Sequence, residues 1–476
     1  MKKLSLIVFL FVSVCGFCFA TESNNTKKIE PLTLTVEDAV SYALTNSKSL
    51  KSSQIDLEIK KRAKMYSWNT FLPSLSVSGT MSRTNENTAY TSGKSAIIQA
   101  ARLQSLENEM PLPSSYYDSI IEQAGFEDTE TLHWVAVGSV SAQLNFNLAM
   151  IQSVCASKAN YEAGLISWEQ TCKDTEINIR KMFYALLLME ENLKIQNELM
   201  ESARARWQQA EINYRNGLVP QLSVLNAQVS YENKKPSILE LTQSLKQQKD
   251  TFAFLLGLPY GREINLVGSI DTRFVDVDAN ELFEKYKDEN LDIKALKKNI
   301  DLLNISLNAS ILSTFTPSVS VNYGWQPMVT QIDKNWIDNY TDNGSFSATV
   351  VIDIMKMMPF SANMQSIKDT KQNIAKAELG LSQLMQNTEI QIHTLVDKIN
   401  KSKASIKASE MNIKLAQKAY DMTVKAYNNG TQELLDVKDS ENSLSQAKLG
   451  LLNEKLNYIS AILDLENAIN VKLAQK

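Results

Sequence analysis

The chain carries few residues whose types and spacing could support catalysis or metal binding. His133 and His393 are the only histidines, and they lie far apart with no metal-ligand spacing. Cys155 and Cys172 would be about 25 Å apart on one helix, which is too far for a disulfide. The sequence has no phosphate-binding loop and no G-x-S-x-G or paired-cysteine motif. It therefore predicts a protein that is not an enzyme and uses no cofactor and no metal.

Two carboxylates near the C-terminus are spaced so that they could act together. Asp436 and Asp439 are three residues apart, so they share one face of a helix. They follow the stretch YNNG at Tyr427–Gly430, and a similar stretch, YRNG, occurs at Tyr214–Gly217. Asp436 and Asp439 could therefore form an acidic site that attracts cations. The alternative interpretation is that they are ordinary solvated charges at the start of a helix.

Long helical segments must position these two stretches. No proline and only one glycine interrupt the chain from Leu148 to Tyr214, and the segment from Pro359 to Tyr427 is similar. Counting back from Tyr214 in steps of seven gives Trp207, Met200, Leu193, Leu186 and Ile179. Counting back from Tyr427 in the same way gives Tyr420, Ile413, Ile406, Ile399 and Ile392, so the two series match with a constant separation along the chain. A strict seven-residue repeat predicts helices that supercoil against neighbours.

The chain reads as two repeats of helix–strand–strand–helix–turn–helix. The motif F-x-P-S occurs at Phe71 and again at Phe315, each time behind a helical segment. Helices are expected at 35–69 and 280–314 before the strands, and at 219–257 and 432–470 after the turns. The predicted organisation is a first repeat at 21–258 with a helix tip at 214–220, a joint at 259–279, a second repeat at 280–470 with a tip at 427–433, and a tail at 471–476.

Four stretches alternate between apolar and small polar residues, which is the pattern of a strand. They are expected at about 74–83, 134–148, 318–326 and 345–354. Each has about the ten residues that a tilted strand needs to cross a bilayer. Aromatic residues mark both ends of these strands, as in membrane β-barrels: Trp68, Phe71, Phe146 and Phe315 at one end, Trp134 and Trp325 at the other. A soluble antiparallel sheet with one wet face would give the same alternation.

Four strands are too few to close a barrel, because about eight are needed and an open edge in lipid leaves backbone groups unpaired. The chain is therefore expected to oligomerise, and three copies supply twelve strands.

The N-terminus predicts export from the cytoplasm. Lys2 and Lys3 precede an apolar run from Leu4 to Phe19, and Ala20 offers a small residue for cleavage, so residues 1–20 form a predicted signal peptide. No other window is apolar enough for a helical membrane span. The net charge of −4 argues against a nucleic-acid partner.

One connection between strands is unusually long. Residues Thr84–Leu132 are polar and contain a predicted short helix near Ile97–Asn108, whereas the corresponding segment at Pro327–Gly344 is much shorter. The long connection is expected to be exposed outside the cell.

Together the signal peptide, the two repeats, the F-x-P-S strand starts and the Y-x-x-G turns resemble the TolC family of outer-membrane efflux proteins. The resemblance covers essentially the whole mature chain. It implies a homotrimer with a twelve-stranded barrel among the lipids of the outer membrane and a long α-helical barrel in the periplasm. It further implies a passive exit duct for tripartite efflux or type I secretion. The implied partners are a periplasmic adaptor and an inner-membrane transporter of the RND, ABC or MFS class. The alternative is a structural coiled-coil or adaptor protein of the periplasm.

The resemblance also implies a periplasmic aperture. Asp436 and Asp439 match the two aspartates of the family, and three copies would bring six carboxylates around the axis. Tyr427 matches as well. Ser223 stands where the family has aspartate and Gln432 where it has arginine, so closure by salt bridges is in doubt.

The same resemblance implies where the adaptor docks. Gly217, Leu218 and Val219 match docking positions at the first turn, and Gly430 and Thr431 match them at the second turn. The turn glycines also have a structural reason, because a positive φ is common after a helix end.

Overall fold

The computed structural model describes residues 32–83, 88–107, 113–123, 134–259, 261–270, 272, 274–329, 340–429 and 431–473. The predicted signal peptide at 1–20 and Gly430 lie outside the described residues. The chain divides into two compact units. We call them the helical unit (Met1–Gln54, Trp168–Asn290 and Gln386–Lys476) and the sheet unit (Ile55–Ser167 and Leu291–Met385).

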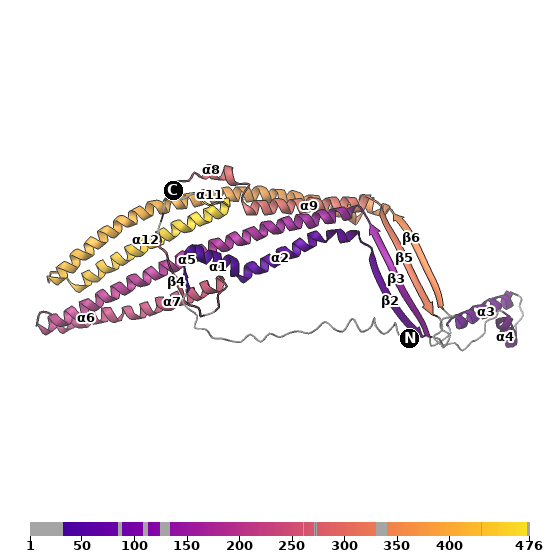
Figure 1. The fold of residues 1–476 in the computed structure, drawn as a ribbon, viewed down its shortest axis with the longest axis horizontal. Coiled ribbons are helices and arrows are strands. Elements are labelled where there is room, and N and C mark those ends of the chain that lie inside the picture. The colour runs from indigo at the N-terminus through magenta and orange to yellow at the C-terminus, as the bar shows by residue number, and fades with distance from the viewer. Residues whose placement is uncertain are drawn as a thin grey trace, which may run out of the picture. The chain divides into compact units, whose positions relative to one another are not determined.

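The sheet unit contains a four-stranded antiparallel sheet (Figure 1). Its strands, in spatial order, are β2 (Ser74–Arg83), β3 (Trp134–Phe146), β5 (Ser318–Val329) and β6 (Tyr340–Val351). β2 covers the range expected from the sequence, and β3 ends two residues earlier. β6 begins five residues earlier than expected and ends three residues earlier. Alternation locates such strands well, whereas their ends depend on pairing partners.

β5 continues three residues beyond its predicted end, past Pro327. Proline lacks the N–H that a central strand donates, so it usually ends a strand. Here its ring lies against Gly138 of β3, where an added Cβ would come within 3.2 Å of the proline Cγ. As a result Trp325 lies inside β5 and not at its end, which corrects the predicted position. Its indole N–H donates to the carboxylate of Asp342 in β6.

The two faces of the sheet differ in chemistry as expected. Ser76 of β2 and Ser141 of β3 share a hydrogen bond of 2.6 Å on the small polar face. On the other face Leu75, Val77 and Met81 are exposed. All six aromatic residues singled out above are exposed, and the rings of Phe71 and Phe146 lie 6.4 Å apart. Trp134 pairs with Arg83 at the opposite end of β2.

The connection between β2 and β3 carries two helices, α3 (Thr88–Glu107) and α4 (Ser114–Gln123), where the sequence predicted one short helix. Ala101 of α3 and Ile121 of α4 are buried, and the two helices pack together. The sheet unit also contains η1 (Ser67–Phe71), α9 (Leu291–Phe315) and α10 (Ile354–Met357).

The helical unit is built on two helix–turn–helix hairpins. The first consists of α5 (Ala149–Arg215), α6 (Gln221–Glu232) and α7 (Lys234–Leu255), and the second of α11 (Ala362–Asn428) and α12 (Leu434–Ile469). Both α5 and α11 have 67 residues and begin in the sheet unit. None of the helices in the described part of the chain combines the length and the hydrophobicity that a membrane span requires.

Several helices predicted as single segments are divided. The segment expected at 35–69 forms α1 (Val36–Asn46), α2 (Lys48–Met65) and η1, and the segment at 280–314 forms α8 (Ala279–Tyr286) and α9. The helix expected at 219–257 breaks at Asn233, between α6 and α7.

The seven-residue ladder forms the buried seam of the long helices. Its buried members are Ile179 and Leu186 in α5 and Ile392, Ile399 and Ile406 in α11. Small residues three positions after a rung are buried too, namely Ala203, Ala210 and Ser402. Small side chains allow close approach of neighbouring helices, as the heptad pattern predicted.

The helical unit also holds two strands that the sequence did not reveal. β1 (Leu32–Leu34) pairs in parallel with β4 (Ile264–Leu266), which lies in the segment predicted as a joint. The prediction of only four strands was therefore wrong, because three-residue strands are too short to show a period. Nearby, Gly257 adopts a φ of 76°, and a Cβ there would lie 2.4 Å from the carbonyl oxygen of Asn46.

An ion pair ties α1 to α5 within the helical unit. Arg180 donates from both terminal nitrogens to the two carboxylate oxygens of Glu37, at 2.7 and 2.8 Å. This hydrogen bonding holds the pKa of Glu37 below its ordinary value, since it outweighs the effect of burial.

Candidate functional site

The first turn joins α5 to α6 and contains three of the predicted docking residues. The N–H of Leu218 donates to the carbonyl oxygen of Asn213 at 2.9 Å, and Gly217 has a φ of 73°. This is the left-handed helix end that glycine favours, so Gly217 has the structural role expected for it. Leu218 is 72% exposed and Val219 is half-buried, and α6 begins after Pro220.

The second turn joins α11 to α12. The N–H and hydroxyl of Thr431 both donate to the carbonyl oxygen of Ala426, at 2.9 and 3.0 Å. Glu433 is the N-cap of α12, and its N–H donates to Asp436 at 3.3 Å in a capping box. Asp436 therefore stabilises the start of α12, independently of its predicted role in the aperture.

Four of the predicted aperture residues lie near this turn, whereas Ser223 lies in α6 beside the first turn. Asp436 and Asp439 are both exposed, as expected for a shared solvated face. Tyr427 and Ser223 are half-buried, and Gln432 is exposed. Within the described residues, no hydrogen bond joins Tyr427 to Ser223 or Gln432.

The sequence did not lead to a buried ion cluster centred on Glu441, which lies in α12 a short distance after Asp436 and Asp439. Glu441 of α12 is 1% exposed, and its Oε2 atom lies 2.8 Å from Nη2 of Arg206 in α5. The ammonium of Lys234, the first residue of α7, lies 3.9 Å from the same oxygen. Arg206 also donates to the hydroxyl of Tyr420 in α11 at 3.4 Å. We call these four residues, which come from four helices, the Glu441 cluster.

The Glu441 cluster had a detectable sequence signal. In α12 the buried residues Val437 and Leu444 are the neighbours of Glu441 in the heptad seam, at spacings of four and three. A charged residue at an apolar seam position predicts a buried partner on another helix, because an unpaired buried charge is costly.

A second ion pair joins the same two helices at another level. Lys181 of α5 bonds to Asp464 of α12, and both side chains are about one-third exposed. Lys181 lies 25 residues before Arg206, or about 37 Å along the helix. The two hairpins therefore contact each other through charged pairs at two separate positions along α5 and α12.

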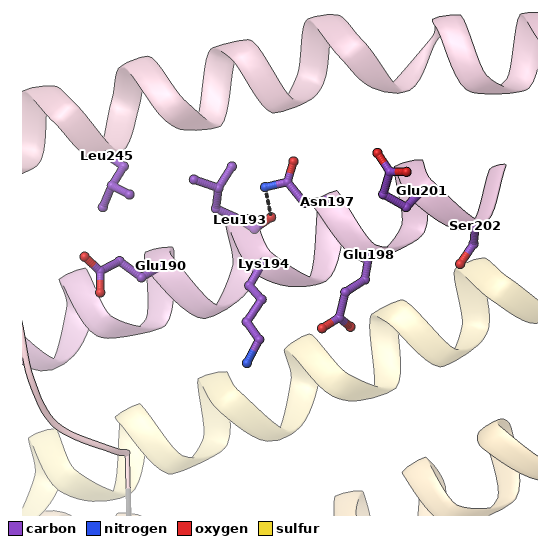
Figure 2. Close-up of a pocket in the computed structure, with 8 residues that line it drawn as sticks. All are labelled: Glu190, Leu193, Lys194, Asn197, Glu198, Glu201, Ser202 and Leu245. Carbon is purple, nitrogen blue, oxygen red and sulfur yellow. Dashed lines mark hydrogen bonds between the residues drawn. The ribbon is translucent and has the colours of Figure 1, made fainter. Parts of the chain in front are cut away.

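An open hollow of about 820 Å³ lies on the first hairpin, where Leu245 of α7 faces residues of α5 (Figure 2). Figure 2 shows that Glu201 points toward α7 whereas Glu198 points away from it, so the carboxylates do not converge. Glu190 is paired with Lys249 at 2.6 Å. The described residues contain no group of three or more His, Cys, Asp or Glu that could hold a metal ion.

Comparison with solved structures identifies the class of fold. The chain superimposes on the outer membrane protein VceC from Vibrio cholerae with a TM-score of 0.67 and 15% identity, over 92% of this chain and 97% of that chain. It superimposes on the Campylobacter jejuni CmeC outer membrane channel with a TM-score of 0.69 and 15% identity, over 93% of this chain and 86% of that chain. The fold is that of an outer-membrane channel.

The sequence comparisons agree with this class. The outer membrane protein TolC of Vibrio cholerae is 22% identical over 404 residues, which span 80% of this chain and 84% of that protein. The outer membrane efflux protein family matches residues 39–258 and 282–471, and the chain belongs to this family. The predicted resemblance is therefore confirmed, and the protein is one of the outer membrane.

Proposed function

We propose that three copies of this chain form a passive exit duct through the outer membrane and the periplasm. The duct would serve tripartite efflux or type I secretion. A periplasmic adaptor would dock at the helical turns, and an inner-membrane transporter of the RND, ABC or MFS class would supply the energy.

The open edges of the sheet are the main support for this proposal. β2 and β6 are the outer strands of the four-stranded sheet, and within the described part of the chain each is paired on one side only. The strands alternate in direction, so β6 of one copy would run antiparallel to β2 of the next. Edges cannot remain open in lipid, because each unpaired backbone group costs several kcal/mol. Three copies would close a barrel of twelve strands.

The helical unit supports the same ring. Met411, Leu415 and Met422 form an exposed apolar seam on α11, roughly opposite the buried seam that contains Ile406. Leu222, Leu225 and Val229 form an exposed seam on α6 with the same kind of spacing. Among the described residues, each hairpin thus offers an exposed apolar seam with heptad spacing. Packing the α11 seam of one copy on the α6 seam of the next would close a ring of helices around a duct.

The chemistry of the turns supports a helical protein partner. No charged residue occurs from Asn216 to Tyr231, and Leu218 projects from the first turn. The second turn is acidic, with Glu433 and Asp436. An adaptor that presents apolar side chains at helical spacing to the first turn and basic groups to the second would match both turns.

Export measured in intact cells tests the proposed function. Deleting the gene should cause cells to accumulate a fluorescent efflux substrate or to lose secretion of a type I substrate. A plasmid copy of the gene should restore export. The transporter and adaptor that co-purify with the protein after cross-linking would identify the class of pump. Unchanged export of all tested substrates and recovery of the protein without any envelope partner would oppose the proposal.

The α6 seam should be required for trimer formation. Leu225→Lys places a charge in the proposed contact and removes about 1.5–3 kcal/mol of apolar burial per copy, so trimers should decrease strongly. Native mass measurement in detergent gives the readout. Asn226→Lys is the matched control, since Asn226 is exposed beside the seam and should tolerate lysine. Equal trimer yields from the two variants would place the contact elsewhere.

The connection carrying α3 and α4 should be accessible from outside the cell. An epitope tag near Asn108 should be labelled by antibody on intact cells, because this long connection is predicted to be exposed outside the cell. A tag after Thr431, at the second turn, should be labelled only after the outer membrane is ruptured. The opposite pattern would reverse the topology.

A further inference from the structure

The helix ends next to the four-stranded sheet lack acidic residues, and the end of α2 is strongly basic. The last six residues of α2, Lys60–Met65, contain four basic side chains, and no acidic residue occurs from Ile59 to Arg83. The end of α5 that adjoins the sheet has no acidic residue before Glu162, and α9 has none after Asp301. Because the whole chain has a net charge of −4, this pattern is specific to the end of the helices beside the sheet.

The helix macrodipole does not explain the pattern. It favours basic residues at the C-terminal end of α2, where Arg62 and Lys64 lie in the last turn. It would favour acidic residues at the N-terminal ends of α5 and α11, but neither helix has one in its first turn. A negatively charged surface beside all of these ends would disfavour acidic residues in each helix and would favour the basic residues of α2.

Two of the four basic side chains are free to contact such a surface. Lys61 and Arg62 are exposed, and among the described residues neither forms an ion pair. The other two lie against α5 of the same copy. The ammonium of Lys64 lies 4.7 Å from the centre of the Tyr161 ring, and the side chain of Lys60 also packs on α5.

Exposed apolar side chains continue from this basic end toward the sheet. Met65 lies one helical turn beyond Lys61 on the same face of α2, and Met65, Trp68 and Leu72 are 58%, 53% and 51% exposed. β2 begins and β6 ends at this same end of the sheet, and Phe360, which follows β6, is also exposed. Basic groups followed by apolar and aromatic groups match the order of a bilayer leaflet, in which headgroups are followed by acyl chains.

We propose that the basic end of α2 binds the headgroup phosphates of anionic phospholipids in the periplasmic leaflet of the outer membrane. Lys61 and Arg62 donate hydrogen bonds to the phosphate oxygens, and Met65 and Trp68 lie beside the first carbons of the acyl chains. Three copies place such contacts around the whole barrel. This inference rests on the proposed duct, because it requires that α2 ends beside the membrane on the periplasmic side.

Native mass spectrometry of purified trimers in mixed micelles of phosphatidylglycerol and phosphatidylcholine tests the lipid contact by counting the lipids that stay bound. Wild-type trimers should retain more phosphatidylglycerol than phosphatidylcholine. A basic residue near an anionic surface favours it by about fivefold, so Lys61→Gln with Arg62→Gln should lower the ratio of the two bound lipids at least about fivefold. Lys48→Gln with Lys51→Gln is the matched control, because it removes the same charge from exposed positions at the other end of α2, about 20 Å away. The control should keep the wild-type ratio.

Two further variants keep the proposal testable if the double variant fails to assemble. Lys61→Gln alone should lower the ratio at least about twofold. Lys61→Arg with Arg62→Lys retains both charges and should retain the lipid preference.

The lipid contact is overturned if wild-type trimers show no preference, if the substitutions at the two ends of α2 lower the ratio equally, or if the charge-retaining variant loses the preference. It is also overturned if Lys61→Gln with Arg62→Gln keeps the lipid ratio but no longer binds peptidoglycan, since the basic face would then contact the cell wall. Wild-type trimers without a lipid preference would leave the proposed duct standing. Recovery of the wild type only as a detergent-free monomer would refute the duct as well.

Discussion

Replacing Val77 by arginine should remove the protein from the outer membrane, whereas the same change at Ser78 should be tolerated. Val77 lies on the apolar face of β2 and is 80% exposed, and Ser78 lies on the small polar face of the same strand. In a barrel the first would contact lipid and the second the water-filled lumen. An arginine on the lipid face costs about 2–4 kcal/mol near the midplane, and every copy in the trimer would bear that cost.

Heat-modifiable migration of outer-membrane fractions measures this outcome. Val77→Arg should yield no trimer band, and Ser78→Arg should yield the wild-type band, with any change confined to ion selectivity. If the arginine is tolerated at Val77 and not at Ser78, the faces of the sheet are reversed. If both variants assemble normally, the sheet does not contact lipid.

Removing the charges of Asp436 and Asp439 together should weaken cation selectivity and block by trivalent cations. Asparagine is the better replacement, because the side-chain oxygen at Asp436 also caps α12. Six exposed carboxylates around the axis would keep much of their solvation, so they would act as a cation filter more than as a contact between copies. A loss of about 1.4 kcal/mol for a trivalent ion corresponds to about tenfold weaker block.

The measurement is block by a trivalent cation in planar bilayers, with trimer assembly checked in parallel. Asp56→Asn is the control, since it removes one exposed charge from α2. It should leave both selectivity and block unchanged. Unchanged block in the Asp436 and Asp439 double variant would mean that these residues form an ordinary solvated face and that the constriction lies elsewhere.

Regular periodicity explains how much of the fold could be predicted. The period of two located β2, β3, β5 and β6, and the seven-residue ladder located the buried seams of α5 and α11. Features without a period were missed. The strands β1 and β4 are too short to alternate, and β5 continues past Pro327 where the proline ring lies against Gly138, a residue distant in sequence.

The candidate site was predicted in part for the same reason. The turn at Gly217 follows from a local rule about helix ends, so it could be predicted from neighbouring residues. The Glu441 cluster depends on four helices meeting, and single-helix periodicity only marks Glu441 as a charge in an apolar seam. The capping role of Asp436 could not be predicted from the usual rule, because the N-cap of α12 is Glu433 and not one of the residues that normally mark a helix start.

Reconstitution of the detergent-purified protein in planar bilayers, combined with its native mass, tests whether the chain forms a trimeric duct. We expect a particle with three times the mass of a single copy that produces discrete, stable conductance steps. A monomer that stays in solution without detergent and produces no conductance would contradict it.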